Sequence, residues 1–370
     1  MRVLHFFKTA LPDTIGGVEQ VIHQVAHASQ KYGVESHVLA LSPDPEPEIM
    51  DMGTYNVHRV HENFNIASTG FSLQAFSRFK ELAAESDIVN FHFPWPFMDL
   101  IHFASRHNKP SVVSYHSDIV NQKHLLMLYQ PLQNKFLQSA DHIIASSPNY
   151  LASSKVLTKF KDKTSIIPIG MDRAIYPVAS PALLAKWKNA ISGPFFLFIG
   201  VLRYYKGLHT LLDALEHTGY PLVIVGSGPK EQELKAQAQR LQLRNVHFLG
   251  RVSDNDKVAL LQLSIAVVFP SHLRSEAFGI TLIEGAMYGK PLISCEIGTG
   301  TTYINIANET GLVVPPEEPM ALRKALRYLW ENPEAASAMG AKSLARFNEL
   351  FTGEKMVEAY MAVYRKLYRA

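Results

Sequence analysis

The chain has 370 residues, 36 lysines and arginines against 33 aspartates and glutamates, a single cysteine and 47% apolar side chains. This length is typical of about two domains, and the lone Cys295 excludes an internal disulfide and argues against a cysteine-based zinc site. A formal net charge of +3 is too small to favour nucleic-acid binding. No apolar run approaches the ~20 residues of a membrane helix, and turn residues come too early for a signal peptide. We therefore expect a soluble, cytoplasmic enzyme.

Short apolar runs alternate with helical patterns along the first half of the chain. A buried strand is predicted at residues 3–7, and the turn at Gly16-Gly17 leads into a helix with apolar residues at helical spacing. Strands that alternate with helices predict βαβ units and a parallel sheet. Further strands are predicted at residues 37–41, 88–93, 111–115, 142–145 and 165–169.

The same alternation restarts after a turn-rich stretch, which we interpret as a linker at about residues 170–190. A terminal amphipathic helix is predicted over residues 354–370, preceded by two more helices. In between, strands are predicted at residues 195–199, 222–225, 246–248, 265–269 and 291–294, and helices at 208–216, 230–241, 254–263 and from about 279.

The predicted fold class is α/β, with two doubly wound Rossmann-like domains and a central cleft. The first domain is expected at residues 1–172 and the second at 173–350, with residues 351–370 packing back on the first. Ligands of open parallel sheets bind at the carboxyl ends of the strands, where helix N-termini and βα loops converge. The candidate functional residues are therefore those that directly follow the strands.

Two cations follow the strand at 195–199. Arg203 and Lys206 lie three residues apart in a loop bounded by Gly200 and Gly207. Arginine offers a bidentate fork, lysine a point charge, and the next helix its positive end, so the loop suits a diphosphate. The alternative is a pair of solvated charges, and the loop alone does not decide between the two interpretations.

The segment from Ser275 to Gly285 is the richest in candidate ligands. Gly279 permits close approach of a ligand at a helix start, so the amides of Gly279, Ile280 and Thr281 can face an anion. A carboxylate at Glu276 or Glu284 suits the vicinal hydroxyls of a sugar or ribose. The alternatives are that Glu276 caps the helix and that Glu284 is an ordinary surface residue.

The ordered motifs resemble those of the family-4 retaining glycosyltransferases of the GT-B fold. The string from Glu276 to Glu284 is similar to their Glu-x7-Glu signature, and Arg203 with Lys206 is similar to their phosphate-binding pair. The resemblance extends over essentially the whole chain. Its other pieces are Gly16-Gly17-Val18-Glu19, Tyr115-His116-Ser-Asp118, Ile167-Pro-Ile-Gly170-Met-Asp172 and Val225-Gly226-Ser-Gly228-Pro229.

The resemblance implies a role for each matching position. Arg203 and Lys206 would hold the diphosphate of a sugar nucleotide, Glu276 would contact the donor sugar, and His116 would lie by the anomeric carbon and an outer hydroxyl; these four form the expected catalytic set. Glu284 would bind the ribose hydroxyls. The other implied donor-binding positions are Gly16, Gly17, Arg251, Val252, Asp254, Lys257, Phe278, Gly279, Ile280 and Thr281.

The resemblance also implies retention of the anomeric configuration, with no cofactor and no divalent metal. We favour same-face attack with the leaving phosphate as the base, because the motifs contain no evident carboxylate nucleophile. Asp254-Asn-Asp256 has the form of an Asp-x-Asp metal motif, but it opens a helical run, so we expect a capping role.

The donor and the acceptor are less well specified. The run from Cys295 to Asn305 keeps its glycines but lacks the glutamate of many relatives, and it looks more like the O-antigen mannosyltransferase branch. We expect GDP-mannose, or a related GDP-hexose, over UDP-sugars. The expected acceptor is a lipid-linked or oligosaccharide glycan of the cell surface. Basic and apolar residues alternate over residues 121–163, so this stretch either docks on anionic lipid at the cytoplasmic face of the inner membrane or is a solvated charged surface.

Three other functions share parts of this pattern. A dehydrogenase is disfavoured because Glu231 stands where the third glycine of the dinucleotide fingerprint belongs. A sugar-nucleotide epimerase or a phosphorylase on the same fold stays an alternative. A non-catalytic scaffold would be expected to have lost Arg203, Lys206, Glu276 and Glu284, all of which are present.

Overall fold

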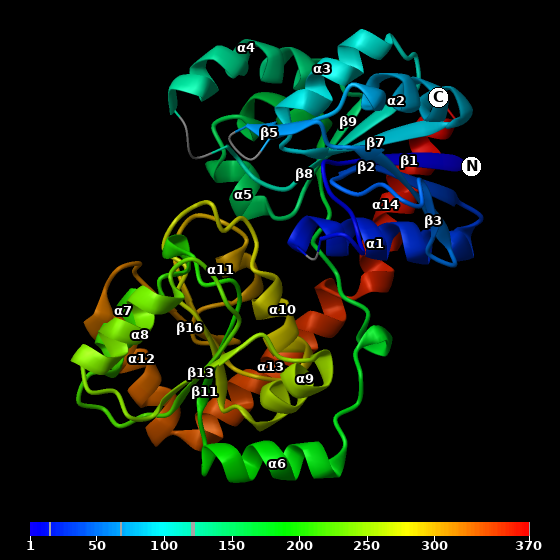
Figure 1. Cartoon of the computed structure of the whole chain (residues 1–370). Coiled ribbons are helices and arrows are strands. Elements are labelled where there is room, and N and C mark those ends of the chain that lie inside the picture. The colour runs from blue at the N-terminus through cyan, green and yellow to red at the C-terminus, as the bar shows by residue number, and fades with distance from the viewer. Residues whose placement is uncertain (15, 67–68, 120–122, 370) are drawn as a thin grey trace. The chain divides into compact units, whose positions relative to one another are not determined.

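The computed structural model describes residues 1–14, 16–66, 69–119 and 123–369 of the chain. The chain divides into two compact units (Figure 1). The first comprises Met1–Gly170 and Gly353–Ala370, and the second comprises Met171–Thr352. Each unit is an α/β layer structure, as the alternating sequence pattern predicts, and each is described here by itself.

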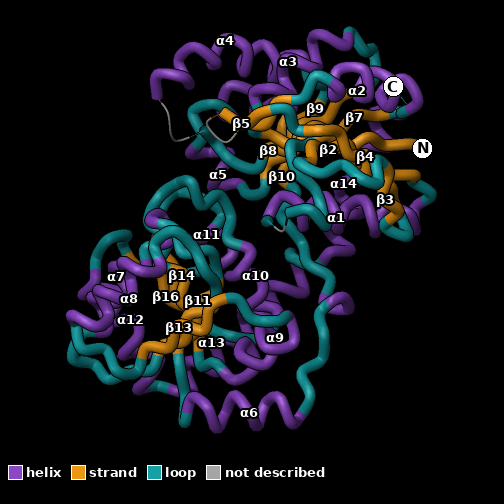
Figure 2. Tube along the Cα trace, in the orientation of Figure 1, coloured by secondary structure: helices purple, strands orange, loops and turns teal. Residues whose placement is uncertain are grey.

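The first unit is built on a sheet in which β1 lies at the centre. The strand order is β10-β9-β8-β7-β1-β2-β4-β3, and all pairs are parallel except the antiparallel pair of β3 and β4. Figure 2 shows the strands in orange and the surrounding helices in purple. A separate hairpin joins β5 to β6. The strands are β1 (Arg2–Phe6), β2 (Glu35–Ser42), β3 (Ile49–Asp51), β4 (Tyr55–His61), β5 (Phe64–Ile66), β6 (Thr69–Phe71), β7 (Ile88–Phe93), β8 (Ser111–Tyr115), β9 (His142–Ala145) and β10 (Thr164–Ile166).

Helices cover both faces of this sheet. The terminal helix packs beside α1, and its Tyr364 hydroxyl accepts a hydrogen bond of 2.7 Å from the buried Asn90 side chain. Met356, Val357 and Tyr360 of the same helix join one apolar core with the central strands, so burial of its apolar face holds the end of the chain on this unit. The helices are α1 (Gly17–Ser29), α2 (Gln74–Glu85), α3 (Pro96–Ser105), α4 (Lys123–Ser139), α5 (Pro148–Ser153) and α14 (Gly353–Tyr368).

The second unit has a fully parallel sheet with the order β13-β12-β11-β14-β15-β16. Its strands are short apolar runs buried on both faces, which is typical of parallel sheets covered by helices. The strands are β11 (Phe196–Ile199), β12 (Leu222–Val225), β13 (Val246–Gly250), β14 (Ala266–Phe269), β15 (Leu292–Cys295) and β16 (Gly311–Val314). The helices are α6 (Pro181–Ile191), α7 (Leu208–Leu215), α8 (Glu231–Arg240), α9 (Asp254–Leu263), α10 (Ile280–Met287), α11 (Thr301–Ile304), α12 (Pro319–Glu331) and α13 (Pro333–Leu350).

Some elements differ from the sequence expectations. Part of the expected linker forms α6, whose N-cap Ser180 accepts a hydrogen bond from the Leu183 amide and is followed by Pro181, a strong helix start. The strands β3, β4, β5, β6 and β16 were not predicted. β4 mixes buried polar and apolar residues, and β16 is only partly buried at the edge of its sheet. Among the described residues, every helix is too short or too polar to cross a bilayer.

Candidate functional site

The strand order of the second unit reverses between β11 and β14, which pair directly. Ligands of doubly wound sheets bind at such a reversal, beyond the carboxyl ends of the strands. The loop after β11 carries Arg203 and Lys206, and the loop after β14 carries Glu276. The topology therefore places the predicted phosphate-binding pair and the first signature carboxylate on adjacent loops.

Glycine allows these two loops to approach each other. Gly207 has a φ of +70°, and a Cβ atom at this position would lie only 2.0 Å from the Pro270 carbonyl oxygen. A side chain here would push the β11 loop away from the β14 loop. Gly207 is thus required for the position of the neighbouring Lys206.

Lys206 and Glu276 form an ion pair across the two loops. Both side chains are 12% exposed, the Lys206 ammonium lies 4.6 Å from the centre of the Phe269 ring, and the Ser271 hydroxyl donates to Glu276 at 3.3 Å. Arg203 begins the same short turn and is exposed. The alternative that Glu276 caps the signature helix is wrong, since the cap is Gly279 without a side-chain hydrogen bond.

The signature helix α10 starts directly behind this pair. Gly279 has a φ of +103° and turns the chain into the helix, so the first amides, at Ile280 and Thr281, have no carbonyl partner within it. The Thr281 hydroxyl donates to the Ile199 carbonyl at 3.1 Å, which fixes the helix against the end of β11. The Phe278 side chain is buried. Thr281 and Phe278 thus shape the site, and the backbone amides are the groups that can face an anion.

Glu284 is the second signature carboxylate, and the alternative of an ordinary surface residue is wrong because Glu284 is only 5% exposed. Its Oε1 atom accepts from the Tyr176 hydroxyl at 3.1 Å and lies 3.0 Å from the Lys257 ammonium. Lys257 also pairs with Asp254 at 3.1 Å. Within the described residues, no hydrogen bond engages Oε2 of Glu284, so this oxygen can accept from a ligand hydroxyl.

Charge pairing controls the protonation of this cluster. Burial alone would lower the pKa of Lys257, but the carboxylates of Glu284 and Asp254 outweigh it, and the pKa is raised. Burial, with the Glu284 charge beside it, raises the pKa of the Tyr176 hydroxyl. At neutral pH the cluster therefore holds a charged lysine and a neutral tyrosine around the carboxylate.

The residues expected to frame the base lie around the start of α9. Arg251 donates from Nε to the Ser227 hydroxyl at 3.1 Å, and Val252 is half-buried. The N-cap of α9 is Ser253, one residue before the expected Asp254. The Ser253 hydroxyl accepts from the Asp256 amide at 3.1 Å. Asp256 instead accepts from the Trp187 indole at 2.8 Å. The two aspartates thus contact different partners, Lys257 for Asp254 and Trp187 for Asp256.

Gly16, Gly17 and His116 belong to the first unit. Gly16 is the N-cap of α1 and Gly17 is its first residue. The Glu19 carboxylate accepts from Thr9 at 2.8 Å and Thr14 at 3.0 Å, which ties the glycine turn to the loop after β1. His116 follows β8 and is half-buried. Its Nε2 atom lies 2.9 Å from Nδ1 of His92.

Three contributing residues were not predicted from the sequence: Tyr176, Ser271 and His92. Tyr176 lies 108 residues before its partner Glu284, in a stretch that the composition identifies only as linker. Ser271 is the second residue after β14, so its position in the strand–loop pattern was a usable signal. His92 lies in an apolar strand, where a histidine is more often structural than functional.

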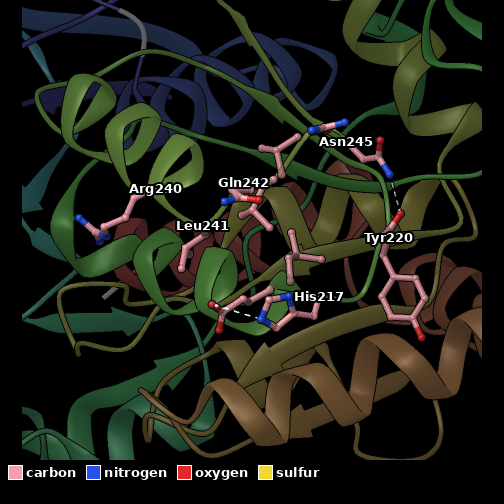
Figure 3. A pocket seen from close by; sticks show the side chains of 12 residues that line it. His217, Tyr220, Arg240, Leu241, Gln242 and Asn245 are labelled. Carbon is pink, nitrogen blue, oxygen red and sulfur yellow. Dashed lines mark hydrogen bonds and ion pairs between the residues drawn. The ribbon is translucent and has the colours of Figure 1, made fainter.

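A hollow of about 440 Å³ lies elsewhere in the second unit (Figure 3). Its lining comes from the ends of α7 and α8, the loops that lead into β12 and β13, and the first residue of β13, and it includes His217, Tyr220 and Arg240. This is the amino end of the sheet, whereas ligands of parallel sheets bind at the carboxyl end. We therefore do not assign the predicted ligand to this hollow.

One group in the described part of the chain has the composition of a metal site. Ligand atoms of His209, His272 and Glu317 lie within 4.8 Å of one another, and Nε2 of His272 is 3.7 Å from the Glu317 carboxylate. Both ring nitrogens of His272 are buried without a hydrogen bond. None of these residues belongs to the expected site.

Comparison with known proteins decides the family. The model of family-4 glycosyltransferases matches residues 15–174, and the model of group 1 glycosyl transferases matches residues 183–346. The D-rhamnosyltransferase WbpZ of Pseudomonas aeruginosa is 60% identical over 95% of this chain and 92% of its own. The O-antigen chain mannosyltransferase C of Escherichia coli is 51% identical over 99% of both chains. The chain belongs to the family-4 glycosyltransferases.

Solved structures confirm the fold class of this glycosyltransferase. Sucrose-phosphate synthase of Thermosynechococcus elongatus has a TM-score of 0.84 at 20% identity and covers 100% of this chain and 99% of its own. HepE of Anabaena, solved with UDP-glucose, has a TM-score of 0.78 at 20% identity over 99% of this chain and 100% of its own. The two Rossmann-like units are thus those of the GT-B fold. The dehydrogenase and scaffold alternatives are excluded by the close relatives, which are both named as glycosyltransferases.

Proposed function

We propose that this glycosyltransferase transfers mannose, or a closely related hexose, from a GDP-sugar to a lipid-linked or oligosaccharide acceptor in O-antigen synthesis. The two close relatives, named as a rhamnosyltransferase and a mannosyltransferase, support this donor class. Rhamnose is 6-deoxymannose, so the two sugars differ by one hydroxyl. The observation that carries the proposal is the pairing of a half-buried cation, Lys206, with the first signature carboxylate, Glu276, at the sheet reversal.

The proposed mechanism assigns the reaction to groups of this chain. Arg203, Lys206 and the first amides of α10 stabilise the charge that develops on the leaving diphosphate. Glu276 orients the hydroxyls of the transferred sugar, and Oε2 of Glu284 accepts from the ribose. His116 contacts the sugar, and Gly17 lets the backbone approach the phosphates. Transfer on the same face retains the configuration, with a leaving phosphate oxygen accepting the proton of the acceptor hydroxyl.

The donor class is tested by nucleotide binding and by transfer. Calorimetry should show GDP binding at least about tenfold more tightly than UDP, a difference of about 1.4 kcal/mol. GDP-mannose and GDP-rhamnose are then compared with the lipid-linked acceptor and with no acceptor present. Tighter binding of UDP would contradict the donor class, and rapid epimerisation of the donor without acceptor would favour the epimerase alternative.

Transfer is expected to be independent of divalent metal. Fixed cations and helix amides meet the diphosphate charge, so excess EDTA should leave the initial rate unchanged. Loss of activity that manganese restores would contradict this mechanism, and would direct attention to the cluster of His209, His272 and Glu317. The matched control is the rate with EDTA already saturated with calcium.

We further propose that α4 of the first unit helps the enzyme bind anionic membranes. Met127 is 63% and Leu128 is 81% exposed, and Lys155, Lys159 and Lys161 are also exposed. Lys163 is an exception among the basic residues of this stretch, since its ammonium donates to the carbonyls of Gln138 and Ala140. Residues 121 and 122 lie outside the described residues. Apolar insertion together with basic charge is typical of interfacial binding.

Vesicle sedimentation tests this surface. The protein should pellet with phosphatidylglycerol vesicles at low salt and less so at high salt, because salt screens the attraction. Replacing Met127 and Leu128 with serine should reduce the pelleted fraction. The same change at Val178, an exposed apolar residue of the second unit, is the control. Equal sedimentation with anionic and neutral vesicles would contradict the electrostatic part, and no sedimentation would contradict the proposal.

A further inference from the structure

Three histidines of the first unit form a hydrogen-bonded chain that ends at His116. His5 lies in β1 and His92 in β7, and His116 follows β8; these strands are neighbours in the order β8-β7-β1. Nδ1 of His5 is 3.1 Å from Nε2 of His92, and Nδ1 of His92 is 2.9 Å from Nε2 of His116. The His92 and His116 ring planes differ by 9°, so the bond between them lies close to both planes.

The surroundings keep all three rings neutral. His5 and His92 are fully buried. Burial lowers the pKa of His5 to about 3 and that of His116 to about 4. Burial, with its two histidine neighbours adding to the effect, also holds the pKa of His92 well below its usual range. Each imidazole therefore carries one N–H at neutral pH.

Counting the protons leaves two possible sets of tautomers for the three hydrogen-bonded histidines. Each of the two bonds needs one N–H, and His92 can donate only one of them. Either all three rings are protonated on Nδ1, and the donors run from His5 through His92 to His116. Or all three are protonated on Nε2, and the donors run in the opposite direction.

The environment of His5, the histidine farthest from His116, decides between the two proton arrangements. Nε2 of His5 is buried and has no hydrogen-bond partner within the described residues. Protonation on Nε2 would leave a buried N–H without an acceptor, whereas protonation on Nδ1 leaves only a lone pair there. Orphaned buried N–H groups are the rarer of the two in folded proteins. The donors therefore run toward His116.

We infer that His5 and His92 are positioning residues that fix His116 with its proton on Nδ1, so that His116 presents an N–H donor to a hydroxyl oxygen of the transferred sugar. Nδ1 of His116 makes no hydrogen bond in the part of the chain that the structure describes. Its Nε2 lone pair accepts the hydrogen bond that Nδ1–H of His92 donates. His116 thus has no lone pair with which to act as a base, and this inference rests on the contact with the sugar in the proposed function.

Histidine NMR tests the tautomers without any activity measurement. In the 15N-histidine-labelled full-length enzyme, Nδ1 should be protonated and Nε2 bare in His5, His92 and His116. The three signals, assigned by through-bond correlation to the backbone of the unmodified enzyme, should not titrate between about pH 5.5 and 8, because all three rings stay neutral there. A proton on Nε2 of His116, or titration of its ring in this range, would overturn the inference.

A matched pair of variants at His92 then tests the link to transfer. A glutamine can donate to His116 and accept from His5, whereas a leucine can do neither. His92→Leu should lower kcat about tenfold, the loss of one hydrogen bond in the transition state, with the Kd for GDP unchanged. His92→Gln should retain most of the activity and the Nδ1 proton of His116. Equal kcat in His92→Leu and the parent enzyme, or equal losses in both variants, would overturn the positioning role.

The two readouts separate this inference from the proposed function. If the enzyme transfers no sugar from any GDP donor but the three rings are protonated on Nδ1, the tautomer assignment stands and the proposed function fails. If transfer is observed but His116 is protonated on Nε2, the inference fails alone. The tautomer is measured on the unmodified enzyme, so poor folding of a variant does not leave the assignment undecided.

Discussion

Replacing Lys206 with alanine is expected to lower kcat about a hundred- to a thousandfold, the usual loss when a preorganised group that stabilises transition-state charge is removed. The Lys206 side chain is 12% exposed and is held in place by Glu276 and the Phe269 ring. A charge fixed in this way needs no reorganisation when the diphosphate leaves. Initial rates with saturating donor measure the effect.

Controls must separate chemistry from folding. Lys206→Ala removes the ion-pair partner of the Glu276 carboxylate, which then keeps only the hydrogen bond that the Ser271 hydroxyl donates at 3.3 Å. We expect a modest fall in Tm, so circular dichroism and Tm should accompany the rates. Lys230→Ala is the matched control, since this lysine of the same unit has a side chain that is 38% exposed and pairs only with Glu233 among the described residues. An unchanged kcat in Lys206→Ala would count against its assigned role.

Replacing Glu284 with glutamine is expected to weaken GDP binding by about ten- to a hundredfold. A hydrogen bond to a charged acceptor contributes about 1.5–3 kcal/mol, and the glutamine loses the charge while keeping the shape. The Tyr176 hydroxyl can still donate to the amide oxygen, and Lys257 keeps Asp254 as a partner. The change therefore isolates the carboxylate charge more cleanly than an alanine would.

Calorimetry with GDP measures this effect directly. The kcat at saturating donor should fall less than the affinity, because the ribose lies away from the reacting atoms. Glu233→Gln, at an exposed ion pair of the same unit, should bind GDP like the parent enzyme. Normal GDP affinity in Glu284→Gln would refute a role for this carboxylate in nucleotide binding.

The sequence predicts the buried parallel strands better than the edges of the sheets. The strands β7, β8, β9 and β12 have the predicted bounds, as has the helix α9. Each of these strands is an apolar run between turn residues, and burial on both faces leaves little ambiguity. By contrast, β3 and β4 lie at the edge of their sheet and include exposed and polar residues. Their pairing depends on neighbours that local periodicity does not encode.

In the candidate site, likewise, features within one short segment were predictable, whereas contacts between distant segments were not. The spacing of Arg203 and Lys206, and of Glu276 and Glu284, could be read from the sequence because each pair lies on one loop or one short segment. The partner of Lys206 lies 70 residues away and that of Tyr176 lies 108 residues away. These contacts arise from strand order, so they emerge only with the tertiary structure. The histidine chain depends in the same way on the adjacency of β1, β7 and β8.

A crystal structure of the enzyme soaked with GDP tests the central claim most directly. The account predicts the diphosphate at the carboxyl end of the second unit's sheet, within hydrogen-bond distance of Arg203, Lys206 and the first amides of α10, with the ribose at Glu284. Density for GDP at the opposite end of the sheet, in the hollow beside Arg240 and Tyr220, would contradict it.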